Sequence, residues 1–281
     1  MEVCKDLSSL RDRVDAWRRS GDRIGFVPTM GNLHDGHMSL LEMARAENRR
    51  TVVSIFVNPI QFGRGEDYER YPSTLDADRT RLAARGTSLV FTPDLDALYP
   101  GGTDEDTRIT VPRLSDILCG RFRPGHFSGV ATVVAKLLIG VQADAAYFGE
   151  KDYQQLLVIR RMARDLCLPV EINSAPIVRE PDGLAMSSRN RYLSAAERAQ
   201  APMLHRVLID TAEGIQRGEV AEALLREGTA RLEAAGFRPE YLEVRRAEDL
   251  GRPGPEDRAL RILVAAWLGG ARLIDNLAVQ R

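Results

Sequence analysis

The sequence predicts an α/β protein, with a Rossmann-like doubly wound parallel sheet followed by a smaller C-terminal α+β domain. Short β-branched runs alternate with helical patterns through the first two thirds of the 281 residues. The runs are apolar without polar alternation, as in parallel strands that helices cover on both faces. Pro, Gly or Asn bound these runs. Alternation of strands and helices in this way is typical of doubly wound folds.

The strands of the large sheet are expected at five apolar runs. These cover residues 24–28, 51–57, 88–92, 145–148 and 170–173. The clearest helix is expected at residues 126–142, where Val130, Val134 and Leu137 recur every three to four positions. A weaker repeat of the same kind covers residues 156–166.

The pattern changes after about residue 179. Ser194 and Glu197 have the spacing of a capping box, which predicts the start of a helix that carries Leu204 and Leu208 on its apolar face. A second helix is expected at residues 220–235, and three strands follow. These cover residues 241–245, 259–267 and 272–279. We therefore expect two domains, residues 1–178 and residues 179–281.

Composition and charge exclude several classes of protein. With 39 basic and 40 acidic residues the net charge is −1, so no overall field attracts a polyanion and no nucleic-acid partner is expected. Cys4, Cys119 and Cys167 are widely spaced, which indicates reduced packing residues and a cytoplasmic setting. Residues 1–6 are charged, and the longest apolar stretch, 262–271, is about half of a membrane span, so no membrane partner is expected.

A glycine-containing turn follows the first predicted strand. Residues 28–37 read Pro-Thr-Met-Gly-Asn-Leu-His-Asp-Gly-His and lead into a helix. Such a turn directs backbone N–H groups and the positive end of the helix dipole towards an anion, and phosphate is the expected one. His34 and His37 fall on the same side of the first helical turn and add imidazole donors. The alternative is that both histidines are ordinary surface or metal-binding residues.

Other phosphate and hydrolase motifs are missing from the sequence. No G-x-G-x-x-G opens a helix, no Lys completes a P-loop after Gly125, and neither G-x-S-x-G nor H-E-x-x-H occurs.

Two further clusters of polar residues occur later in the chain, at residues 149–155 and 186–191. Residues 149–155 come directly after a predicted strand, where Lys151 is placed to reach phosphates and Asp152 a ribose or a metal. A charged helix start that only complements the dipole is the alternative there. Residues 186–191 supply hydroxyls and guanidinium groups on a turn, which suits a mobile phosphate clamp. A solvated loop is the alternative for that cluster.

Taken together, these motifs resemble the pantoate–β-alanine ligase (pantothenate synthetase) family of the nucleotidyltransferase-like group. The resemblance runs in order along the chain. It is carried by residues 28–37, 56–62, 123–130, 148–155 and 186–191, with a weaker match at 273–276. Asn32 stands where the family commonly has a small apolar residue. Arg189 is the cation of the second loop, and no lysine precedes it.

The resemblance implies a reaction and its site. The family joins pantoate to β-alanine with ATP, through a pantoyl adenylate and with loss of pyrophosphate, before the amine displaces AMP. By resemblance the catalytic residues are His37, as proton donor, with His34, Lys151 and Arg189. The implied ATP-binding residues are Met30, Gly31, Asn32, Leu33, His34, Asp35, Gly36, His37, Gly149, Glu150, Lys151, Asp152, Val178, Met186, Ser187, Ser188 and Arg189.

The resemblance also assigns the second substrate pocket and the cofactor. Gln61 and Gln155 are implied to bind pantoate, Gln61 also β-alanine, and Met30 and Phe62 are placed to face the dimethyl carbon. Mg²⁺ is the implied cofactor, with no protein ligand assigned. The family is typically dimeric, so a homodimer is implied, with residues 179–281 closing over the ATP site.

Several other residues are given expected places. Residues 63–67 are the candidate lid, and Arg123 and His126 are expected to complete the anion pocket. Asp76 and Asp78 are expected at the surface of an exposed helix, and His205 is expected to be a surface residue of its helix. Asp76, Asp78 and Asp152 are considered as outer partners of Mg²⁺.

Two other functions stay open from the sequence. One is a related nucleotidyltransferase that attaches a nucleotide to a phosphate ester and stops. The other is a nucleotide-binding regulator, or a metal hydrolase that uses His34 and His37.

Overall fold

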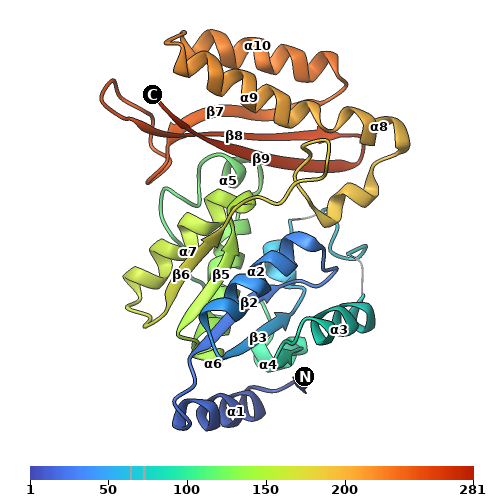
Figure 1. Cartoon of the computed structure of the whole chain (residues 1–281), viewed down its shortest axis with the longest axis vertical. Helices are drawn as coiled ribbons and strands as arrows, with labels where there is room; N and C mark the ends of the chain where they lie inside the picture. Colours follow the sequence, from blue (N-terminus) through green and yellow to red (C-terminus); the bar gives the residue numbers. More distant parts are fainter. Residues whose placement is uncertain (64, 72–73) are drawn as a thin grey trace. The chain divides into compact units, whose positions relative to one another are not determined.

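The computed structural model describes residues 1–63, 65–71 and 74–281. The chain divides into two compact units, the first formed by residues 1–150 and 158–176 and the second by residues 151–157 and 177–281 (Figure 1). A single boundary between residues 178 and 179 was expected from the sequence. In the structure the first unit ends at Pro176, and residues 151–157 group with the second unit. Helix α7 (Tyr153–Asp165) therefore contributes to both units.

The first unit contains a six-stranded sheet in the order β1-β4-β3-β2-β5-β6, and every neighbouring pair is parallel. The strands are β1 (Glu2–Cys4), β2 (Ile24–Thr29), β3 (Arg50–Ile55), β4 (Leu89–Phe91), β5 (Ala145–Gly149) and β6 (Glu171–Ala175). The predicted doubly wound sheet is confirmed. The edge strand β1 was not predicted, because it has only three residues and begins with an exposed glutamate.

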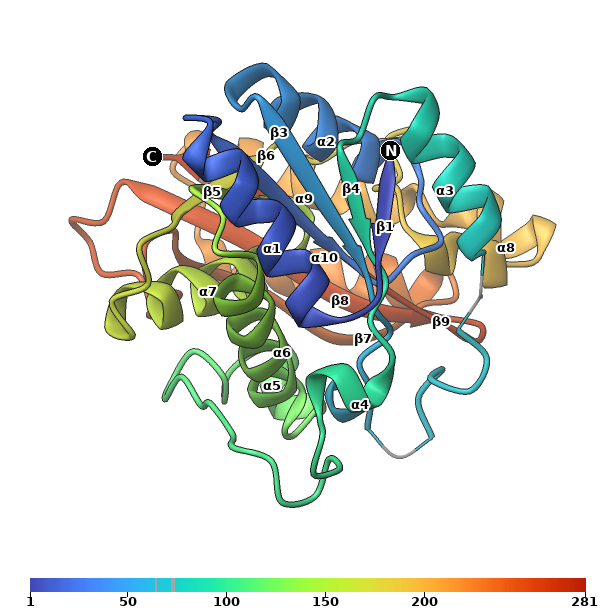
Figure 2. The ribbon, with the colours of Figure 1, turned by 90° about the horizontal axis from the view of Figure 1, so that it is seen from below.

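Helices cover both faces of this sheet. Helix α2 packs on β2, β3 and β5, whereas α1 and α6 pack on each other and α6 reaches β2 from the other side (Figure 2). Helix α6 is apolar around most of its circumference, and 12 of its 16 residues are buried, as a helix at the centre of a fold requires. The helices are α1 (Leu7–Arg19), α2 (Asp35–Glu47), α3 (Leu75–Ala84), α4 (Leu95–Leu98), α5 (Cys119–Phe122) and α6 (His126–Val141), with the 3-10 turn η1 (Pro59–Gln61).

The strand order reverses between β2 and β5. From β2 the chain proceeds outward to β3 and β4, and it then returns to β5 on the opposite side of β2. Ligands of doubly wound proteins bind outside the carboxyl ends of the strands at such a reversal. The turn that follows β2 begins at Met30, and the segment that follows β5 begins at Glu150. The fold therefore points to these two segments.

The second unit contains a three-stranded antiparallel sheet in the order β7-β8-β9. Two of its helices, α9 and α10, cover one face of this sheet (Figure 1). Leu204, Leu208, Leu232, Ile262 and Val264 are among the buried residues between them. The elements are η2 (Glu150–Asp152), η3 (Ser188–Tyr192), α8 (Ala195–Gln200), α9 (Met203–Gln216), α10 (Ala221–Ala234), β7 (Arg238–Arg246), β8 (Ala259–Leu268) and β9 (Ala271–Gln280), of which Glu150 belongs to the first unit.

The capping box at Ser194 forms as predicted, but the helix that it opens is shorter than expected. Ser194 accepts a hydrogen bond from the Glu197 N–H, and the Glu197 carboxylate accepts one from the Ser194 N–H. Helix α8 then ends at Gln200, and α9 begins after Pro202. Proline lacks the N–H of an interior helical residue and clashes with the preceding turn, so one expected helix becomes two.

Two further expectations concern exposure. Cys119 is buried and Cys4 half-buried, but Cys167 is exposed, so the prediction that all three are packing residues is wrong for Cys167. It lies after α7 with a left-handed φ of +53°, at a turn rather than on an apolar face. Within residues 1–63, 65–71 and 74–281, no helix is both long and apolar enough to span a bilayer.

Candidate active site

The turn after β2 has an unusual backbone. Gly31 and Asn32 are both left-handed, with φ of +79° and +51°. A Cβ atom at Gly31 would lie 3.1 Å from the carboxylate of Asp78, so this position needs glycine for space as well as for conformation. Asparagine is among the few other residues that adopt left-handed backbone readily. These two residues reverse the chain so that it enters α2 directly.

A buried carboxylate fixes this turn. The two carboxylate oxygens of Asp78 accept hydrogen bonds from the backbone N–H groups of Asn32, at 2.8 Å, and Leu33, at 2.9 Å, and from the Thr74 hydroxyl. Asp78 is only 3% exposed, so its predicted surface position is wrong. It lies one helical turn before Leu82, which is also buried, and therefore shares the inner face of α3. The Asp76 side chain, by contrast, is fully exposed, as expected.

Asp78 is therefore expected to stabilise the first unit. Asp78→Asn should cost about 1.5–3 kcal/mol of unfolding free energy, because an amide N–H₂ group would face donors that now bind a charged oxygen. Asp76→Asn changes the same charge on the same helix at an exposed position, and should stay within about 0.5 kcal/mol of the unchanged protein. Denaturant unfolding of both variants tests this expectation, and equal stability of the two would contradict it.

Two imidazoles cap helix α2. The Nδ1 atom of His34 accepts from the Gly36 N–H at 3.2 Å, and the Nδ1 atom of His37 accepts from the His34 N–H at 3.3 Å. The ring centroids are 4.1 Å apart. A ring nitrogen that accepts carries no hydrogen, so the neutral form of each ring has its hydrogen on Nε2. The pair therefore presents imidazole N–H donors at the start of α2.

One part of the phosphate hypothesis needs correction. The backbone N–H groups of Asn32 and Leu33 bind Asp78, those of His34 and Gly36 bind the two imidazoles, and the Gly31 N–H binds the Thr29 hydroxyl at 3.2 Å. These donors hold the turn together. The prediction that these N–H groups bind phosphate is therefore wrong, and the two imidazole rings stay the predicted anion donors of the turn.

Gln61 lies beside this turn and is 9% exposed. Its Nε2 is 3.0 Å from the sulfur of Met30, and its Oε1 accepts from the Asn58 amide at 3.2 Å. The side-chain oxygen of Asn58, Oδ1, in turn accepts from the Tyr99 hydroxyl at 2.8 Å. Burial raises the pKa of Tyr99, so the hydroxyl stays a donor. The structure thus brings together Met30 and Gln61, which were predicted to share a substrate.

No role was predicted from the sequence for Asn58 or Tyr99. Asn58 belongs to the quoted motif at residues 56–62, and its position three residues before Gln61 was the only signal available. Tyr99 lies 41 positions further along the chain. Only the folded chain shows that it belongs to this group.

Arg123 and His126 bind the backbone of the same segment. His126 Nδ1 is 2.8 Å from the Gln61 carbonyl oxygen, and His126 Nε2 is 3.0 Å from the Arg123 guanidinium. Arg123 also donates to Glu66 at 2.7 Å, so it is engaged by a carboxylate in addition to its expected place near an anion. Burial raises the pKa of Glu66, but the bond and charge of Arg123 outweigh that effect and lower the pKa overall. Residues 63–67 were predicted as a lid, and residue 64 of that segment lies outside the described residues.

The segment after β5 contains further residues that were predicted to bind ATP or pantoate. Glu150 accepts from the Ser174 hydroxyl at 3.4 Å in the first unit. In the second unit, the Lys151 ammonium group lies 3.8 Å from the Asp152 carboxylate, and the Lys151 side chain is 20% exposed. Gln155 lies on the first turn of α7 and is half-buried.

The predicted phosphate clamp is a compact turn in the second unit. The Met186 N–H donates to the Val178 carbonyl at 3.0 Å, which closes a small hairpin between these two predicted ATP-site residues. The Ser187 hydroxyl accepts from the Arg189 N–H at 3.2 Å and starts η3. Ser187, Ser188 and Arg189 are all half-buried. The cluster is therefore a hydrogen-bonded, half-buried turn and not a fully solvated loop.

His205 is not the surface residue that was expected. Its side chain is 16% exposed, and its Nδ1 lies 3.7 Å from the carboxylate of Asp275. Burial and the neighbouring Arg179 lower the pKa of His205, although Asp275 acts in the opposite direction. Position 205 follows the buried Leu204 on α9, a helix that packs on β9. No local pattern indicates this contact, because Asp275 is 70 positions away.

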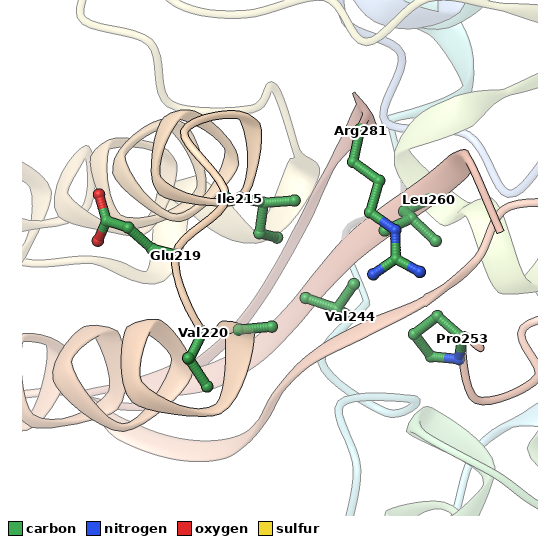
Figure 3. A pocket seen from close by; sticks show the side chains of 9 residues that line it. Ile215, Glu219, Val220, Val244, Pro253, Leu260 and Arg281 are labelled. Atoms are coloured by element: carbon green, nitrogen blue, oxygen red, sulfur yellow. The ribbon is translucent and has the colours of Figure 1, made fainter. Parts of the chain in front are cut away.

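A cavity of about 290 Å³ lies elsewhere in the second unit (Figure 3). It is lined mainly by aliphatic side chains such as Ile215, Val220 and Leu260, together with Glu219 and Arg281. None of the predicted site residues lines it. Among the described residues, no group of three or more His, Cys, Asp or Glu side chains is arranged to hold a metal ion.

The fold and these residues define a class of protein. A parallel sheet with a histidine-capped helix at the reversal of its strand order defines a doubly wound α/β protein, a class in which ligands bind at the carboxyl ends of the strands. The family model described as pantoate-beta-alanine ligase matches residues 2–278. The chain belongs to the pantoate-beta-alanine ligase family and is an enzyme of that family.

Individual relatives agree with this assignment. The chain is 53% identical to the pantothenate synthetase of Chromohalobacter salexigens, over 100% of this chain and 99% of that one. A crystal structure of pantothenate synthetase from Thermus thermophilus superposes with a TM-score of 0.93 at 47% identity and covers all of both chains. The pantoate-beta-alanine ligase of Francisella tularensis, crystallised with beta-gamma ATP and beta-alanine, has a TM-score of 0.83 at 34% identity and covers 99% of this chain and 97% of its own.

Proposed function

We propose that this enzyme condenses pantoate with β-alanine to pantothenate, using ATP and a pantoyl-adenylate intermediate, and releases AMP and pyrophosphate. The observation that carries the proposal is the imidazole pair of His34 and His37, which presents Nε2–H donors at the carboxyl end of β2. Family membership supports the substrates, since a relative has been crystallised with beta-gamma ATP and beta-alanine. The family resemblance further suggests a cytoplasmic homodimer.

In the first step the pantoate carboxylate attacks the α-phosphate of ATP. This carboxylate is already ionised at neutral pH, so no base is needed, but the approach of one anion to another must be made favourable. His34 and His37 would donate hydrogen bonds to the phosphates from the first unit. Lys151, the Ser187 and Ser188 hydroxyls and Arg189 would do so from the second unit, which would close over ATP. His37 would supply a donor to the α-phosphate as negative charge develops.

Pantoate is assigned to Gln61 and Gln155. The side-chain oxygen of Gln61, Oε1, accepts from the Asn58 amide, so the N–H₂ group, which also donates to the Met30 sulfur, is the end that would donate to a substrate oxygen. A neutral amide orients the carboxylate without stabilising its charge as strongly as an arginine pair would, which leaves the carboxylate nucleophilic. In the second step the neutral β-alanine amine, oriented by Gln61, attacks the pantoyl carbonyl. The new C–N bond replaces the bond from the acyl carbon to the phosphate oxygen, so AMP leaves with the electron pair and the amine proton is lost to water.

Mg²⁺ is part of the proposal. The described residues fit an ion that ATP oxygens and water hold, because Asp152 offers a single half-exposed carboxylate and no larger metal-binding cluster is present among them. When bound, Mg²⁺ neutralises phosphate charge. Asp78 is excluded as a partner, since its oxygens already hold the turn after β2.

Exchange of labelled pyrophosphate into ATP tests the proposal. We expect exchange that requires pantoate but not β-alanine, and formation of AMP with pantothenate once β-alanine is added. A nucleotidyltransferase that stops after one step would give no AMP that depends on β-alanine. A metal hydrolase would contain stoichiometric zinc and show no exchange, and either result would replace the proposed function.

A further inference from the structure

Two adjacent residues of β9 bind two different segments of the second unit. Asp275 is 1% exposed at its side chain and accepts two hydrogen bonds from the Arg179 guanidinium, at 2.6 and 3.0 Å. The Asn276 amide donates to the Lys151 carbonyl oxygen at 3.0 Å. Neighbouring side chains of a strand point to opposite faces of the sheet. The pair therefore reaches one segment on each face.

The Arg179 contact fixes the hairpin that carries the predicted phosphate clamp. Arg179 and Ala185 form an antiparallel bridge, and the Arg179 guanidinium also donates to the Gly183 carbonyl at 3.0 Å. Gly183 has a φ of +93°, and a Cβ there would lie 2.8 Å from the His205 ring, so this hairpin packs closely against α9. Met186 ends the hairpin, and Ser187 to Arg189 follow directly.

Because the ion pair between Arg179 and Asp275 is largely removed from water, it is stable in only one geometry. A buried carboxylate with a bidentate arginine is held in one arrangement, because loss of either partner leaves an uncompensated charge away from water. The Asp275 carboxylate also accepts from the Asn276 N–H at 2.8 Å, which ties the two contacts together. Movement of the hairpin relative to Lys151 would break at least one of these bonds.

We propose that Asp275 and Asn276 are positioning residues that hold Lys151 and the Ser187–Arg189 turn in a fixed relation, so that both can bind one ATP triphosphate. This inference rests on the proposed function. Neither residue needs to touch ATP. Their contribution is to make the phosphate-binding groups of the second unit a single rigid set.

Asp275→Asn is the direct test, with Glu240→Gln as the matched control. Glu240 is a 12%-exposed carboxylate of the same small sheet, and it binds Arg272 at 2.7 Å and the Trp267 ring N–H at 2.7 Å. Both changes remove one negative charge opposite an arginine and keep the side-chain size, although Glu240 is half-buried where Asp275 is buried. We expect both variants to unfold at a lower temperature. Only Asp275→Asn should raise the KM for ATP, by about tenfold or more, with the KM for pantoate within about twofold.

A second variant guards against failure of Asp275→Asn to fold. Asn276→Ala leaves the ion pair in place and removes the bond to the Lys151 carbonyl. We expect a smaller rise in the KM for ATP, roughly 2- to 13-fold, as for the loss of one neutral hydrogen bond. The shift of the unfolding temperature by added ATP should shrink in both variants but not in Glu240→Gln.

The outcomes separate this inference from the proposed function. If the unchanged enzyme shows no pantoate-dependent exchange, the proposed function fails. The positioning role is refuted if the unchanged enzyme is active but Asn276→Ala has the same KM for ATP and the same ATP-induced shift of the unfolding temperature. The same holds for Asp275→Asn if that variant folds. The role is refuted equally if Glu240→Gln shows the same loss.

Discussion

Replacement of His37 by alanine is expected to lower kcat by about 10²- to 10³-fold, the cost of removing one donor that stabilises transition-state charge. The imidazole lies at the start of α2, opposite that of His34 at a centroid distance of 4.1 Å. The Nδ1 atom of His37 accepts the His34 N–H that caps the helix. The Nε2–H is therefore the donor whose loss should slow the reaction. Pantoate-dependent pyrophosphate exchange measures the effect on the first step alone.

The control for this variant must keep the cap. Alanine also removes the acceptor for the His34 N–H, which should cost about 0.5–2 kcal/mol of stability in addition. Glutamine is a usual residue at the third position of a capping box and can accept the same N–H. We therefore expect His37→Gln to be more stable than His37→Ala but similarly slow. Turnover near that of the unchanged enzyme in His37→Gln would show that the imidazole has only a structural role.

Gln61→Ala is expected to raise the KM for pantoate by roughly 10- to 150-fold, as for the loss of hydrogen bonds to a charged group. The KM for ATP should change by less than about threefold, because the Gln61 side chain is bonded to the Met30 sulfur and to Asn58 and is assigned to pantoate rather than to ATP. Steady-state kinetics with each substrate varied in turn measure both constants. Equal increases in the two would contradict the assignment of Gln61 to pantoate.

Two buried tyrosines offer a matched test of the same assignment. Tyr99 and Tyr147 are both 0% exposed, and each hydroxyl is bonded to an asparagine, Asn58 and Asn48 respectively. Tyr99→Phe removes the bond that orients Asn58 and hence Gln61, so the KM for pantoate should rise roughly 2- to 13-fold. Tyr147→Phe should leave that KM unchanged, although it should cost more stability because the Tyr147 hydroxyl also donates to the Glu47 carboxylate. If both variants have the same KM for pantoate, the hydrogen bonds from Tyr99 through Asn58 to Gln61 do not contribute to pantoate binding.

Much of the fold could be predicted because its signals are local. The runs at residues 24–28 and 145–148 are apolar enough to be recognised as buried strands, and they lie within β2 and β5. The neighbourhood of the Met30 turn and Gln61 could be anticipated too, since β2 and β3 are parallel and the segments after them leave the same edge of the sheet. The prediction failed where a single residue decides, as at Pro202, which divides one expected helix into α8 and α9.

The supporting residues of the site could not be predicted in the same way. Asp78, Tyr99 and Asp275 act on residues 46, 41 and 96 positions away, respectively. A carboxylate that follows an exposed-looking pattern of charges, as Asp78 does, gives no sign that two backbone N–H groups will meet it. Such contacts depend on how whole helices and strands pack, whereas a sequence motif predicts only the structure of its own segment.

The imidazole capping box has an evolutionary consequence. Where a reactive side chain contributes nothing to folding, its replacement leaves a stable but inactive protein. Here the atoms that would serve catalysis belong to rings that also begin a helix, through the bonds to Gly36 and His34. A lineage that replaced either histidine with a residue unable to accept these N–H bonds would weaken its own scaffold, so drift towards a catalytically silent copy would be confined to replacements that cap, such as glutamine at position 37.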